Sequence, residues 1–219
     1  MRVYGPSSNE PAIKHAGDLV VVPSYSAPGR KEYRISKGFP SSAKLDCENF
    51  NPDIVHIATP DLLGQAALKW ARKRNIPIVS SFHTNFLSYF SYYWPVKPLR
   101  PLFAKYLRWF YSHCEQIYVP SESMIDELKE QMDISRTKLW ARGVELQTFH
   151  PQKRSQEWRN KHGFREDDIV ITFVSRLVLE KDVDIYAKTV QKLQDKYPDQ
   201  VKGLVVGDGP AMADMKNWL

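Results

Sequence analysis

Arg176 and Lys181 lie five residues apart, at the end of a predicted strand and at the start of the helix that follows it. Side chains at these two places can both point into the crevice at the carboxyl edge of an α/β sheet, where ligands bind. A pyrophosphate there would meet two cations and the N–H groups of a helix N-terminus. This arrangement suits sugar transfer from a nucleotide donor, because negative charge grows on the leaving phosphate as the glycosidic bond breaks. On spacing alone, the two cations could instead form a surface charge pair with Glu180.

Four other short motifs also fall where a predicted strand ends: Ser81-Phe82-His83-Thr84, Val119-Pro120-Ser121, Arg142-Gly143-Val144 and Gly207-Asp208-Gly209-Pro210. The neutral imidazole of His83 could share a hydrogen bond with a sugar hydroxyl near pH 7, although a lone histidine at a strand end is more often structural. Taken by itself, the motif at 119–121 predicts only that Ser121 caps the N-terminus of the following helix. The 207–210 motif lacks the last glycine of the dinucleotide-binding fingerprint, because Met212 occupies that position, so by itself it is a weak signal.

A parallel sheet is needed to bring such motifs to one edge. Apolar runs without alternation, such as 54–57 and 76–81, predict strands covered on both faces. Because strands and helices alternate along the chain, we expect an α/β fold with a Rossmann-like, doubly wound parallel sheet. The sequence predicts strands at 54–57, 76–81, 116–119 and 138–141, and helices at 61–74, at 98–113 and after Ser121 or Ser123. Before them, 18–23 reads as a short strand and 24–42, rich in Ser, Pro and Gly, as a loop.

The character of the sequence changes after His150-Pro151. Residues 152–167 are polar and partly helical, which indicates a connector. Residues 168–219 predict the opening of a second α/β unit, with strands at 168–175 and 201–206 and helices at 181–196 and 212–219. We therefore expect an N-terminal domain at 1–151, the connector, and the beginning of a C-terminal domain at 168–219.

Taken in their order and spacing, the five motifs resemble those of family-four glycosyltransferases, which are retaining enzymes with the two-domain GT-B architecture. The resemblance covers roughly 51–219. The family motif G-R-L-x-x-E-K-G reads here Ser175-Arg176-Leu177-Val178-Leu179-Glu180-Lys181-Asp182. The resemblance implies that Arg176 and Lys181 grip the donor phosphates. Both flanking glycines differ, and Asp182 puts a negative charge near those phosphates, which could weaken donor binding.

The resemblance also implies roles for other residues. His83 would lie over the donor sugar and help to position or polarise it, with Thr84 and Asn85 lining the cleft. Arg142 would face the cleft, although its motif is mainly architectural. The loop of Gly207, Asp208 and Gly209 would belong to the donor-binding half. The reaction would be a hexosyl transfer from UDP-sugar or GDP-mannose by front-face attack. We expect no metal, because Arg176 and Lys181 would take its place beside the phosphates. We also expect no cofactor, because the nucleotide-sugar is a substrate.

Among family-four members, the chain looks most like lipid-directed ones, namely sulfoquinovosyl-diacylglycerol synthases and lipid mannosyltransferases. The similar segments are Ser81 to Thr84, the basic aromatic helix after it, and Trp140 to Val144. A lipid acceptor is therefore implied, at the cytosolic face of a membrane.

The distribution of charge agrees with a membrane partner. The net charge is +6, and no acidic residue occurs between Asp61 and Glu115, a stretch rich in Lys, Arg and aromatic residues. Such a surface suits anionic lipid headgroups, or nucleic acid; alternatively, half of the aromatics are core and the charges form a solvated face. We expect contact with an anionic membrane and no nucleic acid. The two cysteines fit a reducing cytosol, and no run of residues is long and apolar enough to span a membrane, so we expect a cytoplasmic, peripheral protein.

Two expected parts of the family pattern are missing from the sequence. Nothing before Asp18 matches the opening strand with its Gly-rich loop, and the E-x7-E motif of the second domain is absent. We therefore expect a truncated chain that holds half a donor site and does not turn over. The alternative is a non-catalytic half-enzyme that binds a membrane or a protein partner through its basic aromatic surface.

Overall fold

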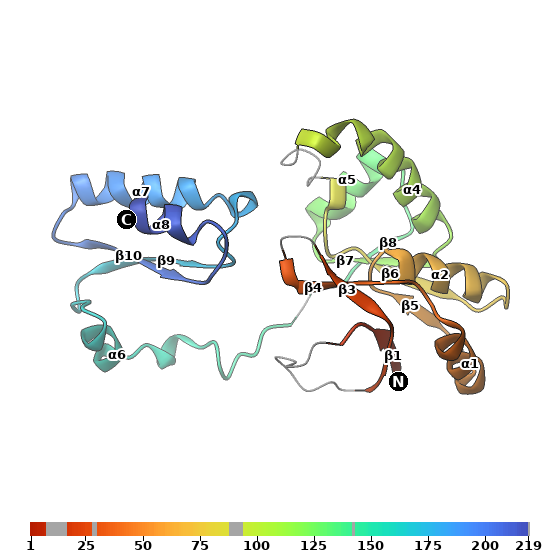
Figure 1. Ribbon diagram of the computed structural model, residues 1–219. Coiled ribbons are helices and arrows are strands. Elements are labelled where there is room, and N and C mark those ends of the chain that lie inside the picture. Colours follow the sequence, from red (N-terminus) through yellow and green to blue (C-terminus); the bar gives the residue numbers. More distant parts are fainter. Residues whose placement is uncertain (8–16, 28–29, 88–93, 142, 219) are drawn as a thin grey trace. The chain divides into compact units, whose positions relative to one another are not determined.

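The computed structural model describes residues 1–7, 17–27, 30–87, 94–141 and 143–218. The protein is an α/β protein with two compact units, Met1–Arg142 and Gly143–Leu219 (Figure 1). The finer division into 1–151, 152–167 and 168–219 remains a prediction.

The first unit is built on a parallel sheet of four strands. In spatial order these are β5 (Val55–Ile57), β6 (Ile78–Ser81), β7 (Gln116–Val119) and β8 (Thr137–Leu139). The order in space follows the order in sequence, so right-handed crossovers bring the intervening helices to the same face. These helices are α2 (Leu62–Arg72), α4 (Arg100–Ser112) and α5 (Glu122–Met132), and a 3₁₀ segment, η1 (Trp94–Leu99), precedes α4 (Figure 1).

The two faces of this sheet differ in burial. Ile57 and Ile117 point to the helix-covered face and are buried with Leu107 and Phe110 of α4. On the other face His56 is exposed. The expectation that 54–57 is a strand covered on both faces is therefore wrong, because the described helices cover one face of β5; β6, whose four residues are all buried, does fit it.

Local signals set the helix starts. The carboxylate of Asp61 accepts a hydrogen bond from the backbone N–H of Gly64 over 2.8 Å and caps α2. A Cβ at Gly64 would lie 2.0 Å from the carbonyl oxygen of Thr59, so only glycine fits there. Of the two predicted caps of α5, Ser121 is the one observed, with its hydroxyl accepting from Met124 N–H over 3.4 Å.

The first 50 residues contain more structure than the sequence predicts. Strand β1 (Arg2–Gly5) pairs in parallel with β2 (Asp18–Val21), while β3 (Ser24–Ala27) and β4 (Arg30–Ser36) form an antiparallel pair, and α1 (Ser41–Phe50) follows. The expected loop at 24–42 is therefore wrong. Polar residues pair this hairpin, as when Arg34 donates to Ser24 Oγ over 2.9 Å, and α1 starts after Pro40 without a side-chain cap. Neither feature gives a hydrophobic period or a capping signal.

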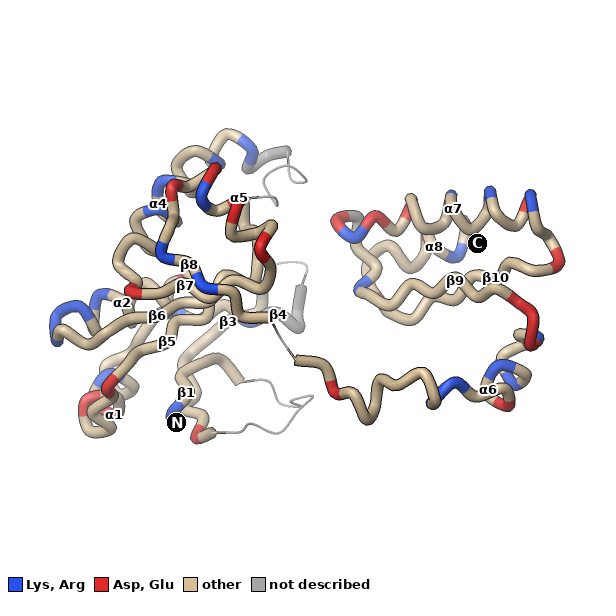
Figure 2. Tube along the Cα trace, turned by 180° about the vertical axis from the view of Figure 1, so that it is seen from behind, with Lys and Arg blue, Asp and Glu red and all other residues tan. Residues whose placement is uncertain are grey.

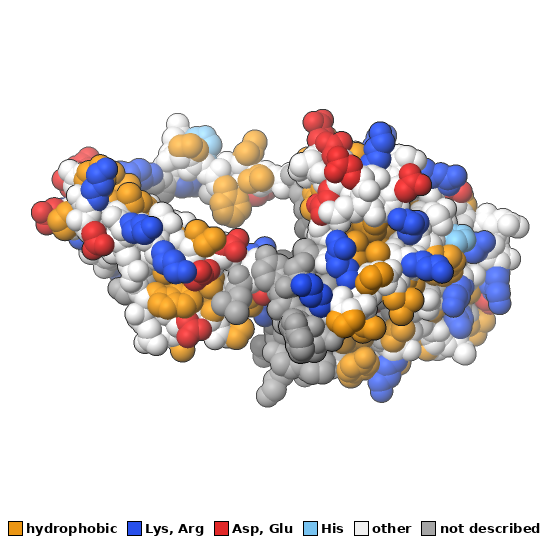
Figure 3. All heavy atoms as spheres, turned by 90° about the horizontal axis from the view of Figure 1, so that it is seen from above, with side chains coloured by type: hydrophobic (Ala, Val, Ile, Leu, Met, Phe, Trp, Pro, Cys, Tyr) orange, Lys and Arg blue, Asp and Glu red, His pale blue; other side chains and the backbone are white. Residues whose placement is uncertain are grey.

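Charged residues of the first unit are unevenly placed. Blue segments, which mark the positions of Lys and Arg, recur along the trace of α2 and α4 (Figure 2). Seen from above, basic and hydrophobic side chains lie interspersed on the side of this unit that carries α4 (Figure 3). The acid-free stretch of the sequence thus maps onto a mixed basic and apolar surface.

The second unit is a parallel strand pair with helices on one face. Strands β9 (Ile169–Val174) and β10 (Val201–Val206) pair in register, and α7 (Val183–Lys196) and α8 (Met212–Trp218) lie on the same side of them (Figure 1). From α7, the Tyr186 hydroxyl donates to the carbonyl of Ile171 over 2.8 Å, with the carbonyl of Leu204 at 3.2 Å. The side chain of Val174 is 71% exposed, because the described helices cover one face.

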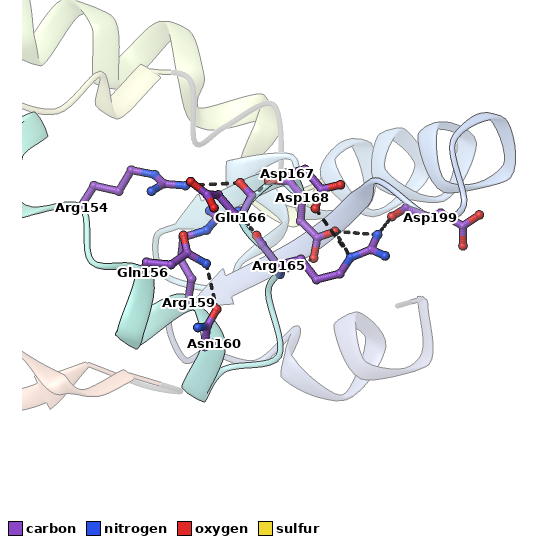
Figure 4. Close-up of polar contacts among 9 residues, drawn as sticks. All are labelled: Arg154, Gln156, Arg159, Asn160, Arg165, Glu166, Asp167, Asp168 and Asp199. Atoms are coloured by element: carbon purple, nitrogen blue, oxygen red, sulfur yellow. Dashed lines mark hydrogen bonds and ion pairs between the residues drawn. The ribbon is translucent and has the colours of Figure 1, made fainter.

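Before β9, the chain contains a 3₁₀ turn, η2 (Pro151–Lys153), and α6 (Gln156–Lys161), and a polar network ties this connector to the strand (Figure 4). Asp168 accepts from the backbone N–H of Arg165 over 2.8 Å and from its guanidinium Nε over 3.1 Å. Arg159 donates to the carbonyl of Asp168 over 2.7 Å. The backbone hydrogen bond from Arg165, then its guanidinium hydrogen bond and its charge, hold the pKa of the Asp168 carboxyl below its ordinary value.

Candidate functional site

In the second unit, the loops that follow β9 and β10 are joined by backbone hydrogen bonds. Ser175 N–H donates to Val206 O over 3.2 Å, and Leu177 N–H donates to Asp208 O over 2.9 Å. Parallel pairing makes this possible, because the carboxyl ends of two parallel strands lie at the same edge. The two motifs that the sequence placed at strand ends, 175–177 and 207–210, therefore meet at one edge.

Two glycines permit this close approach. A Cβ on Gly207 would lie 1.9 Å from the carbonyl oxygen of Ser175, and one on Gly209 would lie 2.4 Å from that of Leu177. Both distances are shorter than any real contact, so a side chain at either position would force the loops apart. Asp208 turns back on this loop and accepts from Gly209 N–H over 2.7 Å.

The predicted cations lie on the first of these loops and just before α7. Arg176 is exposed and directly precedes Leu177 in the joined segment. Lys181, also exposed, ends the 3₁₀ turn η3 (Leu179–Lys181), and Asp182 forms the N-cap position of α7. Two cations, a helix N-terminus and backbone from two loops thus gather at one edge. The acidic side chains of Asp182 and Asp208 are present there too.

At position 182 the backbone explains the glycine of the family motif. Asp182 has φ 53° and ψ 40°, in the left-handed region that glycine adopts without strain. Its side chain makes no capping hydrogen bond. Asp182 therefore adds strain and negative charge without serving as a conventional cap.

In the first unit, the segment after β6 carries His83, Thr84 and Asn85. Its position is fixed by the backbone, since Phe82 N–H donates to Tyr118 O over 2.8 Å. His83 is exposed, and its ring centroid lies 6.0 Å from that of Trp140, which follows β8. The two residues thus come from strand ends two strands apart in the sheet.

The side-chain amide of Asn85 is engaged within the protein. Its Nδ2 donates to the carboxylate of Glu127 on α5 over 2.6 Å, and Gln131 donates to the same oxygen over 3.0 Å. Glu127 therefore orients Asn85 and, with it, the segment that carries His83 and Thr84. The sequence offered no signal for this partner, because the pair is distant along the chain.

A second group of rings, which the sequence did not single out as a site, lies beside His83. His56 shares a 2.6 Å hydrogen bond between its Nε2 and the buried hydroxyl of Ser81, and its ring lies 5.9 Å from Trp140 and 6.1 Å from Tyr118. Desolvation of the imidazole by the surrounding rings lowers the pKa of His56, which favours the neutral ring. The sequence signal that could have indicated this group is His56 itself, a polar residue within the predicted apolar strand 54–57.

The predicted site residues therefore fall into two groups. His83, Thr84 and Asn85 come together in the first unit, and Arg176, Lys181 and the loop of Gly207, Asp208 and Gly209 come together in the second. Arg142 lies outside the described residues. Within the described ranges, no group of three or more His, Cys, Asp or Glu side chains could hold a metal ion.

Comparisons with known proteins agree with this architecture. Residues 1–148 match the family described as Glycosyltransferase Family 4, and 154–219 match Glycosyl transferases group 1. In the solved structure of HepE from Anabaena in complex with UDP and glucose, the matching part covers 83% of this chain and 48% of that one, with a TM-score of 0.53 and 15% identity. The fold is thus the α/β GT-B type, as the sequence predicted. The chain belongs to glycosyltransferase family 4.

Curated relatives carry related names. The chain is 31% identical to a GDP-mannose-dependent alpha-mannosyltransferase of Corynebacterium glutamicum, over 88% of this chain and 45% of the relative. It is 27% identical to a sulfoquinovosyl transferase of Arabidopsis thaliana, over 88% of this chain and 37% of the relative. It is 28% identical to an alpha-monoglucosyldiacylglycerol synthase of Streptococcus pneumoniae, over 90% of this chain and 46% of the relative. The chain spans less than half the length of these relatives.

Proposed function

We propose that this chain is part of a retaining glycosyltransferase that moves a hexosyl group from a nucleotide-sugar to the hydroxyl of a lipid. The donor would be a UDP-sugar or GDP-mannose. The observation that carries the proposal is the junction of the loops 175–177 and 207–210, which gathers Arg176, Lys181 and the N-terminus of α7 at one sheet edge.

The chemistry of this edge fits a leaving diphosphate. Arg176 would bind phosphate oxygens through paired N–H groups, and Lys181 would add a second positive charge. Both would act most strongly as negative charge develops on the leaving group, and no metal would be needed for that. His83, with Thr84, would contact the sugar, while Asn85 would serve through its bond to Glu127.

The lipid acceptor rests on the names of the relatives, one of which is a diacylglycerol glucosyl synthase. The basic aromatic stretch 62–114 fits a peripheral protein that contacts an anionic membrane from the cytosol. No helix in the described part of the chain is long and apolar enough to cross a membrane.

Nucleotide binding tests the donor site directly. We expect Arg176→Glu to weaken binding of UDP and GDP by roughly 10- to 100-fold, because a charge-assisted hydrogen bond is replaced by repulsion. Lys192→Glu is the matched control, since Lys192 is an exposed cation further along α7. Titration calorimetry with both nucleotides reads the result, and circular dichroism checks the fold. Equal affinities for Arg176→Glu and wild type would refute the donor site.

The remaining alternative is a non-catalytic chain that binds a membrane or a protein partner. It predicts vesicle binding with no affinity for UDP or GDP at any accessible concentration. Nucleotide binding that depends on Arg176 would exclude it.

A further inference from the structure

An open pocket with a volume of about 450 Å³ lies along η1 and α4. It is lined by Leu99, Leu102, Phe103, Lys105, Tyr106 and Trp109, and its walls are almost entirely apolar. This surface, the α4 groove, belongs to the first unit and contains none of the residues assigned to the donor.

The groove combines three rings that pack partly against the core, those of Phe103, Tyr106 and Trp109, with leucines that the core does not use. Helix α4 already buries Leu107, Phe110 and Tyr111 against the sheet. Leu99 and Leu102, in contrast, are 53% and 68% exposed. Exposed leucines clustered in a concave apolar surface indicate a binding site rather than a solvated face.

One side of the groove is formed by aromatic rings that pack against one another. Tyr106 and Trp109 stack with centroids 6.0 Å apart, and Phe103 lies 5.8 Å from Tyr106. The hydroxyl of Tyr106 donates to Pro60 O over 2.8 Å, so its polar end is satisfied by the protein. The ring is thereby available to an apolar occupant.

The charges around the groove are complementary to an anion. Lys97, Arg100 and Lys105 are exposed on η1 and α4. No acidic residue occurs between Asp61 and Glu115, so this part of the sequence provides no carboxylate to neutralise them. An occupant of the groove should therefore combine a long apolar part with a negatively charged end.

We propose that the α4 groove takes an acyl chain of an anionic phospholipid, with Lys105 and its basic neighbours holding the phosphate. The inference deepens the proposed membrane contact and does not depend on sugar transfer. It assigns the contact to one groove, in which a tail is inserted, rather than to diffuse attraction between a basic surface and a bilayer.

Vesicle binding by paired variants tests the groove. The vesicles are phosphatidylcholine alone or mixed with phosphatidylglycerol, and co-sedimentation gives the affinity. We expect Leu102→Ser to weaken binding to the mixed vesicles about tenfold, because one leucine-sized apolar contact is lost. The control is Leu45→Ser, since Leu45 on α1 is 58% exposed and lies outside the groove. Both sites are exposed, so both variants should fold.

A lysine pair separates the role of Lys105 from that of net charge. Lys105→Gln and Lys129→Gln remove the same charge, but Lys129 is an exposed residue of α5 outside the groove. We expect the first variant to bind mixed vesicles more weakly than the second. Equal binding would leave the phosphate contact unsupported and would contradict that part of the proposal.

Fluorescence reports whether a tail enters the groove. Lipids brominated on the acyl chain should quench Trp109 on binding, and Trp109→Phe should remove most of that quenching while the vesicles still bind. Unchanged quenching in Trp109→Phe, or equal binding by Leu102→Ser and Leu45→Ser, would overturn the proposal.

Self-association that is lost in Leu102→Ser, without any vesicle binding, would instead assign the groove to a second copy of the chain. Binding of soluble UDP measures the donor site separately, so the donor-site proposal and the groove proposal can fail independently.

Discussion

Asp133 ends α5 with φ 54° and ψ 39°, a left-handed backbone conformation in which a Cβ is strained. Its negative charge also lies at the helix C-terminus, where the helix dipole is unfavourable for anions. Both effects lower the stability of the folded state. We expect Asp133→Gly to raise the free energy of unfolding of the first unit by about 1 kcal/mol, measured by urea denaturation.

Asp126→Gly is the control for this change, because Asp126 is an exposed residue in the right-handed part of the same helix. There glycine should lower the free energy of unfolding by about 0.5 kcal/mol. A loss of stability in both variants would show that the strain at Asp133 has been overstated.

The two cysteines make a second prediction about single residues. Cys47 and Cys114 are both buried and free, and burial raises the pKa of both thiols, that of Cys114 to about 12. A buried thiol with a raised pKa forms little thiolate, which is the reactive species. We expect neither to react with Ellman's reagent at pH 8 in the folded chain, and both to react in urea. Rapid reaction of the folded chain would contradict this burial.

At the scale of elements, Asp168 joins the connector to β9, and its effect should depend on pH. Because its folded pKa is depressed, the stability it provides is fully present above the unfolded pKa of about 3.9 and is lost as the pH falls through the folded pKa. We expect Asp168→Asn to be less stable than wild type at pH 7, with a difference that shrinks below about pH 4. Denaturation followed at several pH values measures this difference.

Asp167→Asn is the matched control, since the Asp167 side chain is exposed and 3.8 Å from the Arg165 guanidinium. It should leave the pH profile close to that of wild type. A difference between Asp168→Asn and wild type that stays constant down to pH 2 would show that the carboxylate charge is not the cause.

Elements with strong local signals could be predicted from the sequence, and others could not. Strands β7 and β10 were predicted at their observed bounds, and Asp61 as the cap of α2. The hairpin at 24–36 was missed because polar pairing across strands gives no apolar period. The junction of the loops after β9 and β10 was expected from parallel strands alone. The contacts of Asn85 with Glu127 and of His83 with Trp140 depend on long-range packing, which local patterns do not encode.

At the scale of the whole molecule, the two units should respond to mutation separately. Val119 and Val190 are both fully buried, one in each unit. Val119→Ala and Val190→Ala should each lower stability by about 2 kcal/mol. We expect hydrogen exchange to rise within the mutated unit while the other keeps its protection. Faster exchange across both units in either variant would mean that they unfold as one.

The parallel pairing of β9 with β10 also constrains how the second unit is made. A parallel partner can be reached only after the crossover helix α7 has been synthesised, so the pair is a non-local contact that forms late. While the ribosome is still adding α7, β9 is an apolar strand without its partner. We infer that this interval exposes the nascent chain to aggregation, and that it ends when β10 leaves the exit tunnel.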